Sequence, residues 1–335
     1  MNFVQWQRDA IRGPARFFSL ARHALVAALQ KAGIGEADRV LLPEFICRDV
    51  VAAIHAVGAT AVWYPVGEDL RPAKPADEWA DARAVLAVDY FGFDQPLAPF
   101  RAYAARTGAL VIEDNAHGFL SRDDNGGWLG TRASFGIFSL RKTLPIPDGA
   151  MLVTNDAQSV DDLPEQLKES GRGFAPGVAV RAIVQHIPLL GATVANFMTA
   201  VVRKLRWLRT GHAIPPSDSE SEWVIPGIAA PHRGLADTLS RLDVAGEINR
   251  RRTLYLAAKY VAASAGIEPL FSDFPVGVAP YGFPFRVRSF TSVEPLQRWS
   301  KSRGLELIGW PDLPDEIVKS APDRYRNVRL VNFLC

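Results

Sequence analysis

The stretch from Val111 to Asp156 reads VIEDNAHGFLSRDDNGGWLGTRASFGIFSLRKTLPIPDGAMLVTND and contains the groups on which our prediction of this fold depends. An apolar strand-like run ends in Glu113 and Asp114, and a carboxylate at a strand end reaches the edge where α/β sheets bind ligands. His117 follows three residues after Asp114, where it can face the same pocket. A second strand-like run, FGIFSL, leads to Lys142. Each residue type alone more often has a structural or surface role, so the prediction rests on their combination.

On the N-terminal side of this stretch, helical periodicity alternates with short apolar runs, which is typical of a sheet wrapped by helices. Residues 20–32 and 46–58 place apolar side chains at helical spacing. The strand-like runs are rich in β-branched or aromatic residues and end in turn-forming or polar residues. They cover residues 39–43, 59–66, 84–92, 109–115 and 135–140.

The pattern breaks between about 157 and 240, where a Pro/Ser/Asp-rich segment predicts a long excursion over the surface. A charged helix from about residue 236 then leads to two strand-like runs, 281–287 and 305–310, which are separated by a helix-like segment. We therefore predict a large domain over residues 1–235, with the excursion at about 157–235, and a small C-terminal α/β domain over residues 236–335.

A charge-free stretch, 182–202, is followed directly by the basic segment RKLRWLR. Polar residues and a proline interrupt it, and these are costly in hydrocarbon. Its apolar residues repeat at helical spacing. We therefore favour burial in the core or in a subunit interface over peripheral membrane contact, and a membrane span is the least favoured reading.

The composition excludes several classes of protein. Apolar residues make up 48% of the chain and the formal net charge is +2 with scattered basic residues, so we expect a globular protein that does not bind nucleic acid. Cys47 and Cys335 form no spacing typical of a metal site or a disulfide framework. We expect no bound metal and, since the N-terminus has no signal-peptide pattern, a cytoplasmic location.

The order of motifs is VIEDNAHG, then SFGIFS, then a lysine, then DGAMLVTND, and it resembles the DegT/DnrJ/StrS family of pyridoxal-phosphate (PLP)-dependent sugar aminotransferases. FSLARHALVAAL, RVLLPEFICRDVVAAIHAVG and EINRRRTLY extend the resemblance over about residues 15–330. It implies the PLP-transferase fold type I of aspartate aminotransferase, an α/β fold. Its large domain has a mixed, mostly parallel sheet flanked by helices, and a small C-terminal α/β domain follows.

Residue by residue, the resemblance implies that Lys142 binds PLP covalently and moves a proton between substrate and cofactor. Asp114 would pair with the pyridine nitrogen and keep it protonated, because a cationic ring is the electron sink. His117 would lie against or hydrogen-bond the ring. The phosphate contacts would be Ser139 and the backbone N–H groups of Ala21 and Arg22 at a helix start.

The implied reaction moves an amino group, with glutamate as the expected donor, to a keto group of a nucleotide-linked deoxysugar, in a homodimer. Three alternatives stay open. Some relatives dehydrate sugars with PLP, but they carry histidine in place of the lysine, so Lys142 argues against this. A non-catalytic binding or regulatory protein is the second. It is motivated by a two-residue shortening between Ser139 and Lys142 and by a missing asparagine segment. Cys47 stands where many relatives place an aromatic ring against PLP. The third is a membrane-surface scaffold using residues 182–209.

Overall fold

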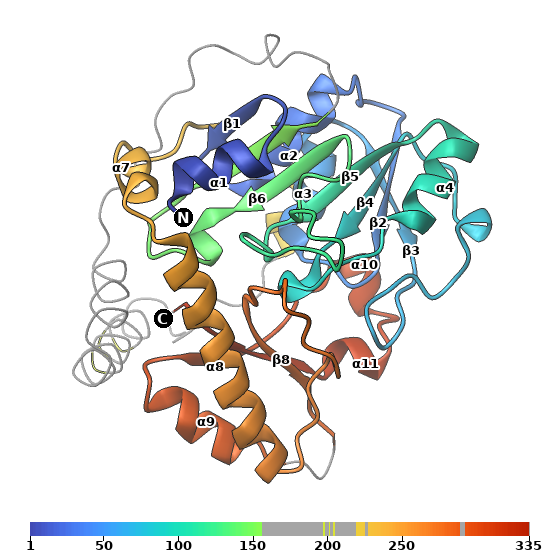
Figure 1. Ribbon diagram of the computed structural model, residues 1–335. Coiled ribbons are helices and arrows are strands. Elements are labelled where there is room, and N and C mark those ends of the chain that lie inside the picture. The colour runs from blue at the N-terminus through green and yellow to red at the C-terminus, as the bar shows by residue number, and fades with distance from the viewer. Residues whose placement is uncertain are drawn as a thin grey trace.

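The computed structural model describes residues 1–155, 197, 201, 204, 219–224, 227–288 and 292–334. This part of the chain forms a seven-stranded sheet in the order β1-β7-β6-β5-β4-β2-β3 and a three-stranded sheet in the order β8-β10-β9 (Figure 1). Strands β2 to β6 pair in parallel, whereas β7 and β1 are antiparallel to their neighbours. The predicted α/β fold with a mixed, mostly parallel sheet is therefore confirmed.

The strands of the large sheet are β1 (Ala15–Phe18), β2 (Arg39–Pro43), β3 (Thr60–Tyr64), β4 (Ala84–Val88), β5 (Leu110–Asn115), β6 (Phe135–Ser139) and β7 (Ala150–Thr154). Strands β2 to β6 lie close to the predicted runs, whereas β1 and β7 were not predicted. Every residue of β4, β6 and β7 is buried. Strands that are buried on both faces read as continuous apolar runs, as these do, because helices cover both sides of a parallel sheet.

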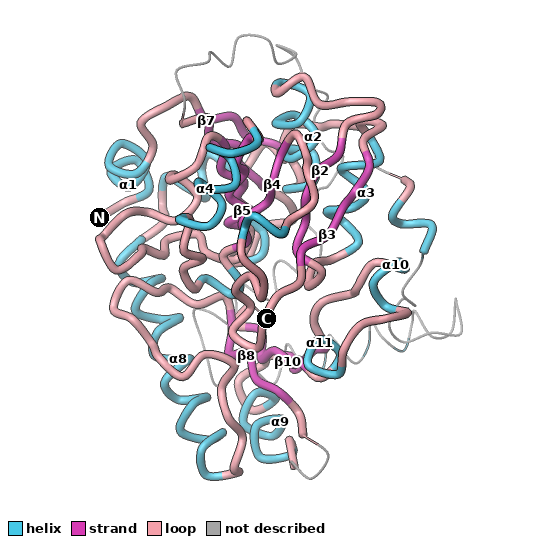
Figure 2. Tube along the Cα trace, turned by 90° about the vertical axis from the view of Figure 1, so that its right-hand side faces the viewer, coloured by secondary structure: helices cyan, strands magenta, loops and turns pink. Residues whose placement is uncertain are grey.

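Helices lie on both faces of this sheet. Figure 2 shows α2 (Ala21–Lys31) and α3 (Arg48–Ala56) on one side and α1 (Phe3–Ala10) and α4 (Ala98–Thr107) on the other. Short 3₁₀ turns connect the elements at η1 (Ala76–Glu78), η2 (Tyr90–Gly92) and η3 (Leu140–Lys142).

The small sheet consists of β8 (Gly282–Arg286), β9 (Glu306–Gly309) and β10 (Val328–Asn332), and α8 (Val244–Ser264) and α9 (Glu294–Lys301) pack beside it. Its buried residues belong to the same hydrophobic core as those of the large sheet. The remaining elements are short: η4 (Ser219–Glu222), α7 (Leu235–Ser240), α10 (Asp315–Val318) and α11 (Asp323–Arg326). A division into domains at residue 235 stays a prediction.

The prediction of a single charged helix from about residue 236 is wrong in one respect. The segment forms two helices, α7 and α8. Asp243, between them, has an extended backbone and forms a β-bridge with Asn2. Val244 also donates its backbone N–H to the carbonyl oxygen of Met1. Pairing with the N-terminal segment therefore competes with helical hydrogen bonding at this point.

The charge-free stretch at 182–202 lies outside the described residues except at positions 197 and 201. The prediction of a buried or interfacial helix there stays untested. Among the helices of the described chain, none combines the length and hydropathy needed to cross a bilayer.

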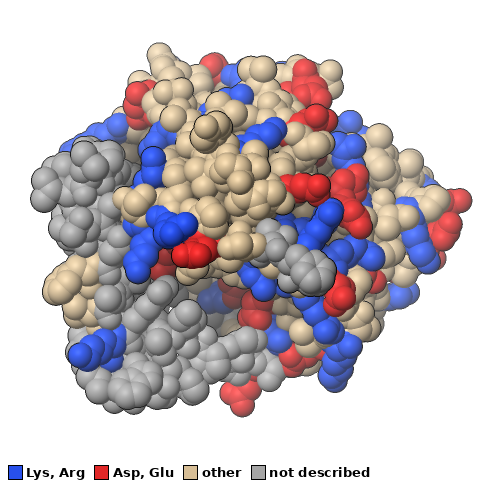
Figure 3. All heavy atoms as spheres, turned by 90° about the horizontal axis from the view of Figure 1, so that it is seen from below, with Lys and Arg blue, Asp and Glu red and all other residues tan. Residues whose placement is uncertain are grey.

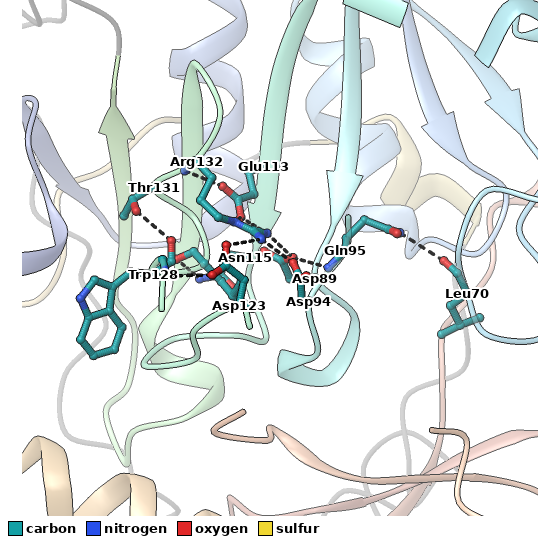
Figure 4. Close-up of polar contacts among 12 residues, drawn as sticks. Leu70, Asp89, Asp94, Gln95, Glu113, Asn115, Asp123, Trp128, Thr131 and Arg132 are labelled. Carbon is teal, nitrogen blue, oxygen red and sulfur yellow. Dashed lines mark hydrogen bonds and ion pairs between the residues drawn. The ribbon is translucent and has the colours of Figure 1, made fainter. Parts of the chain in front are cut away.

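A buried ion cluster holds the strand ends of the large sheet together, and Figure 4 shows it around Arg132. The Arg132 side chain donates from Nε to Glu113 on β5 at 2.7 Å and lies 3.0 Å from the Asp89 carboxylate after β4. It also pairs with Asp94 and, at 3.4 Å, with Asp123. Both Asp89 and Glu113 are fully buried. Burial alone would lower the pKa of Arg132, but the charges of Asp89 and Glu113 raise it.

We predict that Arg132→Met destabilises the fold, because it leaves Asp89 and Glu113 buried without their cation. Breaking a buried ion pair from one side lowers the free energy of unfolding by about 3–5 kcal/mol. Urea denaturation of the two proteins measures the difference.

The matched control is Arg83→Met, since the Arg83 side chain is 59% exposed and lies 3.9 Å from Asp38. Its effect should stay below about 1 kcal/mol. Equal denaturation midpoints for Arg132→Met and the unmodified protein would show that the cluster does not stabilise the fold.

Candidate active site

A pocket lies where the ends of β5 and β6 meet the N-termini of α2 and α3. Ligands of open α/β sheets bind at this edge, beyond the carboxyl ends of the strands. Five of the six predicted site residues line the pocket, and the sixth, His117, reaches it through its contact with Lys142. The five are Ala21, Arg22, Asp114, Ser139 and Lys142.

Lys142 is the last residue of η3, which begins directly after β6. The tight 3₁₀ turn advances the chain by only three residues from Ser139 and still brings the lysine to the pocket. Leu140, within the turn, is fully buried and fixes the turn to the core. The two-residue shortening seen in the sequence therefore does not remove the amine from the site.

Asp114 is the acid that faces the pocket. The residue is 9% exposed, and its carboxylate accepts a hydrogen bond from the backbone N–H of Ala116 at 3.0 Å. Burial raises the pKa of Asp114, while the nearby Lys142 charge and the Ala116 N–H act in the opposite direction. Glu113, its neighbour in sequence, points to the other face of the sheet and binds Arg132. Of the two acids at this strand end, only one therefore belongs to the site.

His117 is almost fully buried and contacts the site lysine, with 3.1 Å between its Nε2 atom and Lys142 Nζ. Its Nδ1 atom accepts a hydrogen bond from the backbone N–H of Phe91 at 3.3 Å. The ring stacks on Tyr281, with ring centroids 4.6 Å apart. Burial and the Lys142 charge lower the pKa of His117 well below its usual value, so the ring is neutral near pH 7. Sequence reasoning missed Phe91 and Tyr281, because aromatic residues distant in sequence give no motif.

The opposite end of the pocket is suited to an anion. Helix α2 begins at Ala21, and its N-cap residue, Leu20, provides no side-chain hydrogen bond to the first turn. Arg22 pairs with Asp49, and its Nε atom is buried with no hydrogen-bond partner within the described part of the chain. Ser139 is also buried beside this helix end. Backbone N–H groups at a helix start, with a cation and a hydroxyl close by, form a favourable site for phosphate.

A second ion cluster supports the pocket wall, and no sequence motif indicated it. Arg48, the first residue of α3, binds Glu222 and lies 3.3 Å from Asp312 and 2.6 Å from Asp315. The Arg48 and Glu222 side chains are each only 7% exposed. The cluster therefore joins the start of α3 to η4 and to the segment that follows β9.

Comparison with known proteins relates part of the chain to one family. The model of the DegT/DnrJ/EryC1/StrS aminotransferase family matches residues 18–178. A curated relative, the pleiotropic regulatory protein of Geobacillus stearothermophilus, is 32% identical over 152 residues, which is 43% of this chain and 40% of that protein. The chain thus matches less than half of the length of this relative.

Solved structures extend the likeness to nearly the whole chain. S. venezuelae DesV has a TM-score of 0.64 at 20% identity, covering 99% of this chain and 83% of that one. The E. coli GDP-4-keto-6-deoxy-D-mannose-3-dehydratase with bound hydrated PLP has a TM-score of 0.62 at 15% identity. The match covers 98% of this chain and 85% of that one. These likenesses confirm the predicted fold.

We predict that Cys47, a free thiol at the N-cap of α3, reacts slowly with iodoacetamide. Burial raises its pKa from 9.0 to about 11, although the Lys142 charge lowers it in part. Because the thiolate is the reactive form, its fraction at pH 8 is about 100-fold smaller than for an ordinary thiol.

The labelling rate of the Cys47 peptide, followed by mass spectrometry, should therefore rise steadily from pH 8 to about 11. The same peptide in urea-denatured protein is the control and should react about 100-fold faster at pH 8. Equal rates in the folded and denatured protein would contradict the burial of this thiol beside Lys142.

Proposed function

We propose, because the model of the DegT/DnrJ/EryC1/StrS aminotransferase family matches residues 18–178, that the protein is a PLP-dependent aminotransferase of this family. Its proposed acceptor is the keto group of a nucleotide-linked deoxysugar in polysaccharide or glycoconjugate biosynthesis, and its proposed amino donor is glutamate. One observation carries the proposal: a lysine amine and a buried carboxylate, Lys142 and Asp114, line the same pocket.

The pocket fits PLP by its chemistry. The cofactor has an aldehyde, a basic ring nitrogen and a phosphate, and each needs a different partner. Lys142 provides the amine, Asp114 the carboxylate, and the start of α2 with Ser139 the phosphate site. Ala116 and Cys47 also line the pocket, so small side chains leave room for a flat ring.

When bound, PLP supplies an electron sink for the carbanion formed at the substrate carbon. The protein contributes position and charge. Lys142 Nζ would take the proton from the substrate carbon and pass it to the cofactor. This requires an amine within reach of both the substrate carbon and the cofactor atom that receives the proton. Asp114 would hold the ring nitrogen in its protonated form, and its burial strengthens this interaction because the local dielectric is low. His117 would hold Lys142 in place through the contact between its Nε2 atom and Lys142 Nζ.

Two other functions have less support from the site. Dehydration, the reaction named for the E. coli neighbour, is less well supported, because Lys142 occupies the position where such relatives of the family carry histidine. A non-catalytic regulatory protein is favoured by the name of the curated relative. The presence of the amine, the carboxylate and the uncapped helix start in one pocket supports catalysis, since regulation alone requires none of them.

We further propose that the partners are small molecules and that the protein is a cytoplasmic homodimer, as the family resemblance implies. Basic and acidic side chains are interspersed over the face seen in Figure 3. Such a surface has no strong field of one sign, which is consistent with small-molecule substrates in place of nucleic acid.

The test of this function is covalent trapping of PLP. Protein mixed with PLP should absorb visible light, and borohydride reduction followed by peptide mapping should place the label on Lys142. Lys142→Ala should lose the visible band and the label. Lys74→Ala, at an exposed lysine far from the pocket, should keep both. A colourless protein, or a label on another lysine, would favour the regulatory function.

We predict that Asp114→Asn keeps PLP attached to Lys142 but lowers the transfer rate from glutamate. The amide cannot supply the charge that keeps the ring nitrogen protonated, and loss of one preorganised electrostatic contact costs about 100- to 1,000-fold. The measurement is 2-oxoglutarate formed per turnover, with Asp124→Asn, an exposed surface change, as the control. An unchanged rate would exclude the proposed role of Asp114.

A further inference from the structure

The hydrogen bonds of His117 define where its proton lies. A backbone N–H can only donate, so the bond from Phe91 requires Nδ1 of His117 to be unprotonated. The neutral ring then carries its proton on Nε2. Burial lowers the pKa of His117, which agrees with a ring that does not gain a second proton.

This tautomer also defines the form of the lysine. Nε2 of His117 lies 3.1 Å from Lys142 Nζ, which is within hydrogen-bond distance. Because Nε2 is the donor, Nζ has to accept with a lone pair. An ammonium group has no lone pair, so this contact selects the free amine of Lys142.

Backbone geometry positions the Phe91 donor. Phe91 has left-handed backbone angles (φ 58°, ψ 14°), which are rare for an aromatic residue, and Gly92 follows at φ 91°. A β-carbon at Gly92 would lie only 2.9 Å from the carbonyl oxygen of Ala279. The segment before β8 therefore packs closely against this turn, and a side chain at position 92 would not fit without a shift. The strained turn at the end of β4 thus directs the Phe91 N–H at the imidazole instead of continuing the strand.

Stacking fixes the orientation of the imidazole. The Tyr281 ring lies parallel to it at an interplanar angle of 2°, and the Phe91 ring is near-parallel at 14°. The Trp310 ring is tilted at 67°, with its centroid 5.0 Å from that of the imidazole. Tyr281 donates its backbone N–H to the carbonyl oxygen of Phe91 at 2.8 Å, which ties the start of β8 to the turn after β4. Rotation of the ring would break both hydrogen bonds and three ring contacts.

We infer that His117 is a positioning residue that holds Lys142 as an oriented free amine before any cofactor binds, in a tautomer fixed by the Phe91 N–H. The inference rests on the proposed function, since the same lysine would bind PLP. The amine is the form that attacks an aldehyde, so a lysine held in this form needs no separate base.

Other charged groups line the pocket around Lys142. They are Asp114 on β5, Arg141 in η3 and Arg22 on α2. Cys47 is a neutral thiol at ordinary pH, and Asp49 is paired with Arg22. His117 contacts Nζ directly, at 3.1 Å, so its removal should change the amine most directly.

The first test observes the tautomer in the full chain free of PLP. Long-range proton–nitrogen NMR distinguishes an imidazole protonated on Nε2 from one protonated on Nδ1 and from imidazolium. We expect the Nε2–H form of His117 to persist from pH 6 to 9, with the signal assigned by its loss in His117→Gln. An Nδ1–H tautomer, or imidazolium at pH 7, would overturn the inference.

The second test measures the amine itself. Trace acetylation of the same PLP-free chain, with peptide mapping, reports how much of each lysine is free amine at each pH. Lys142 in His117→Leu should react at least about tenfold more slowly at pH 7, because the donor that selects the amine is gone, and should recover by about pH 10. His117→Gln, whose amide N–H can still donate, should restore part of the rate.

The matched control is His55→Leu, since the His55 ring stacks on Trp223 outside the pocket. It should leave the Lys142 profile unchanged. An identical Lys142 profile in His117→Leu and in the unmodified chain would overturn the inference. Neither test contains cofactor, so failure of PLP to label Lys142 would count against the proposed function alone.

Discussion

Side chains alternate along a strand, and this sends two neighbouring carboxylates of β5 to opposite faces of the large sheet. Glu113 is fully buried against Arg132, which also holds Asp89 at the end of β4. Asp114 enters the pocket from the other face. The ion pair on one face therefore fixes the height and angle at which the carboxylate on the other face meets Lys142.

Loops, not strands, provide the other side chains of the site around the Asp114 carboxylate. The turn after β4 brings Phe91 to His117, and the turn after β6 brings Lys142 to the same imidazole. Both turns begin at the carboxyl ends of parallel strands, where chemistry gathers in open sheets because the strand ends converge there. The start of α3 is held separately by Arg48 and its three carboxylates.

Much of the fold could be predicted because its central strands are buried on both faces and so read as uninterrupted apolar runs. Strand β1 and helix α4 gave no comparable signal. In β1 only the last residue is fully buried, and α4 has only two buried residues, so neither shows a clear apolar pattern. The break between α7 and α8 depends on Asn2 and Met1, which are more than 200 residues away in the chain. Periodicity within a window does not report such pairing.

The site was predictable where it follows a local motif. Asp114, Ser139 and Lys142 are close in sequence, and the sheet brings them to one pocket. Arg132, Phe91 and Tyr281 were not predicted, because an isolated arginine or aromatic residue is common in any folded chain. The backbone conformation of Phe91 has no sequence signal at all, since left-handed angles at a bulky residue are stabilised only by the surrounding structure.

The stacking of Tyr281 on His117 has a consequence for the order of folding. The large sheet carries Lys142, His117 and Phe91, whereas Tyr281 directly precedes the first strand of the small sheet. A nascent chain that has formed only the large sheet would have the lysine but lack the ring that holds its imidazole neighbour in place. The reactive amine would then be completed only after the C-terminal half has docked. On an incomplete chain, metabolic aldehydes would meet a Lys142 whose amine is not yet held in place. They would meet the oriented amine only on the fully folded molecule.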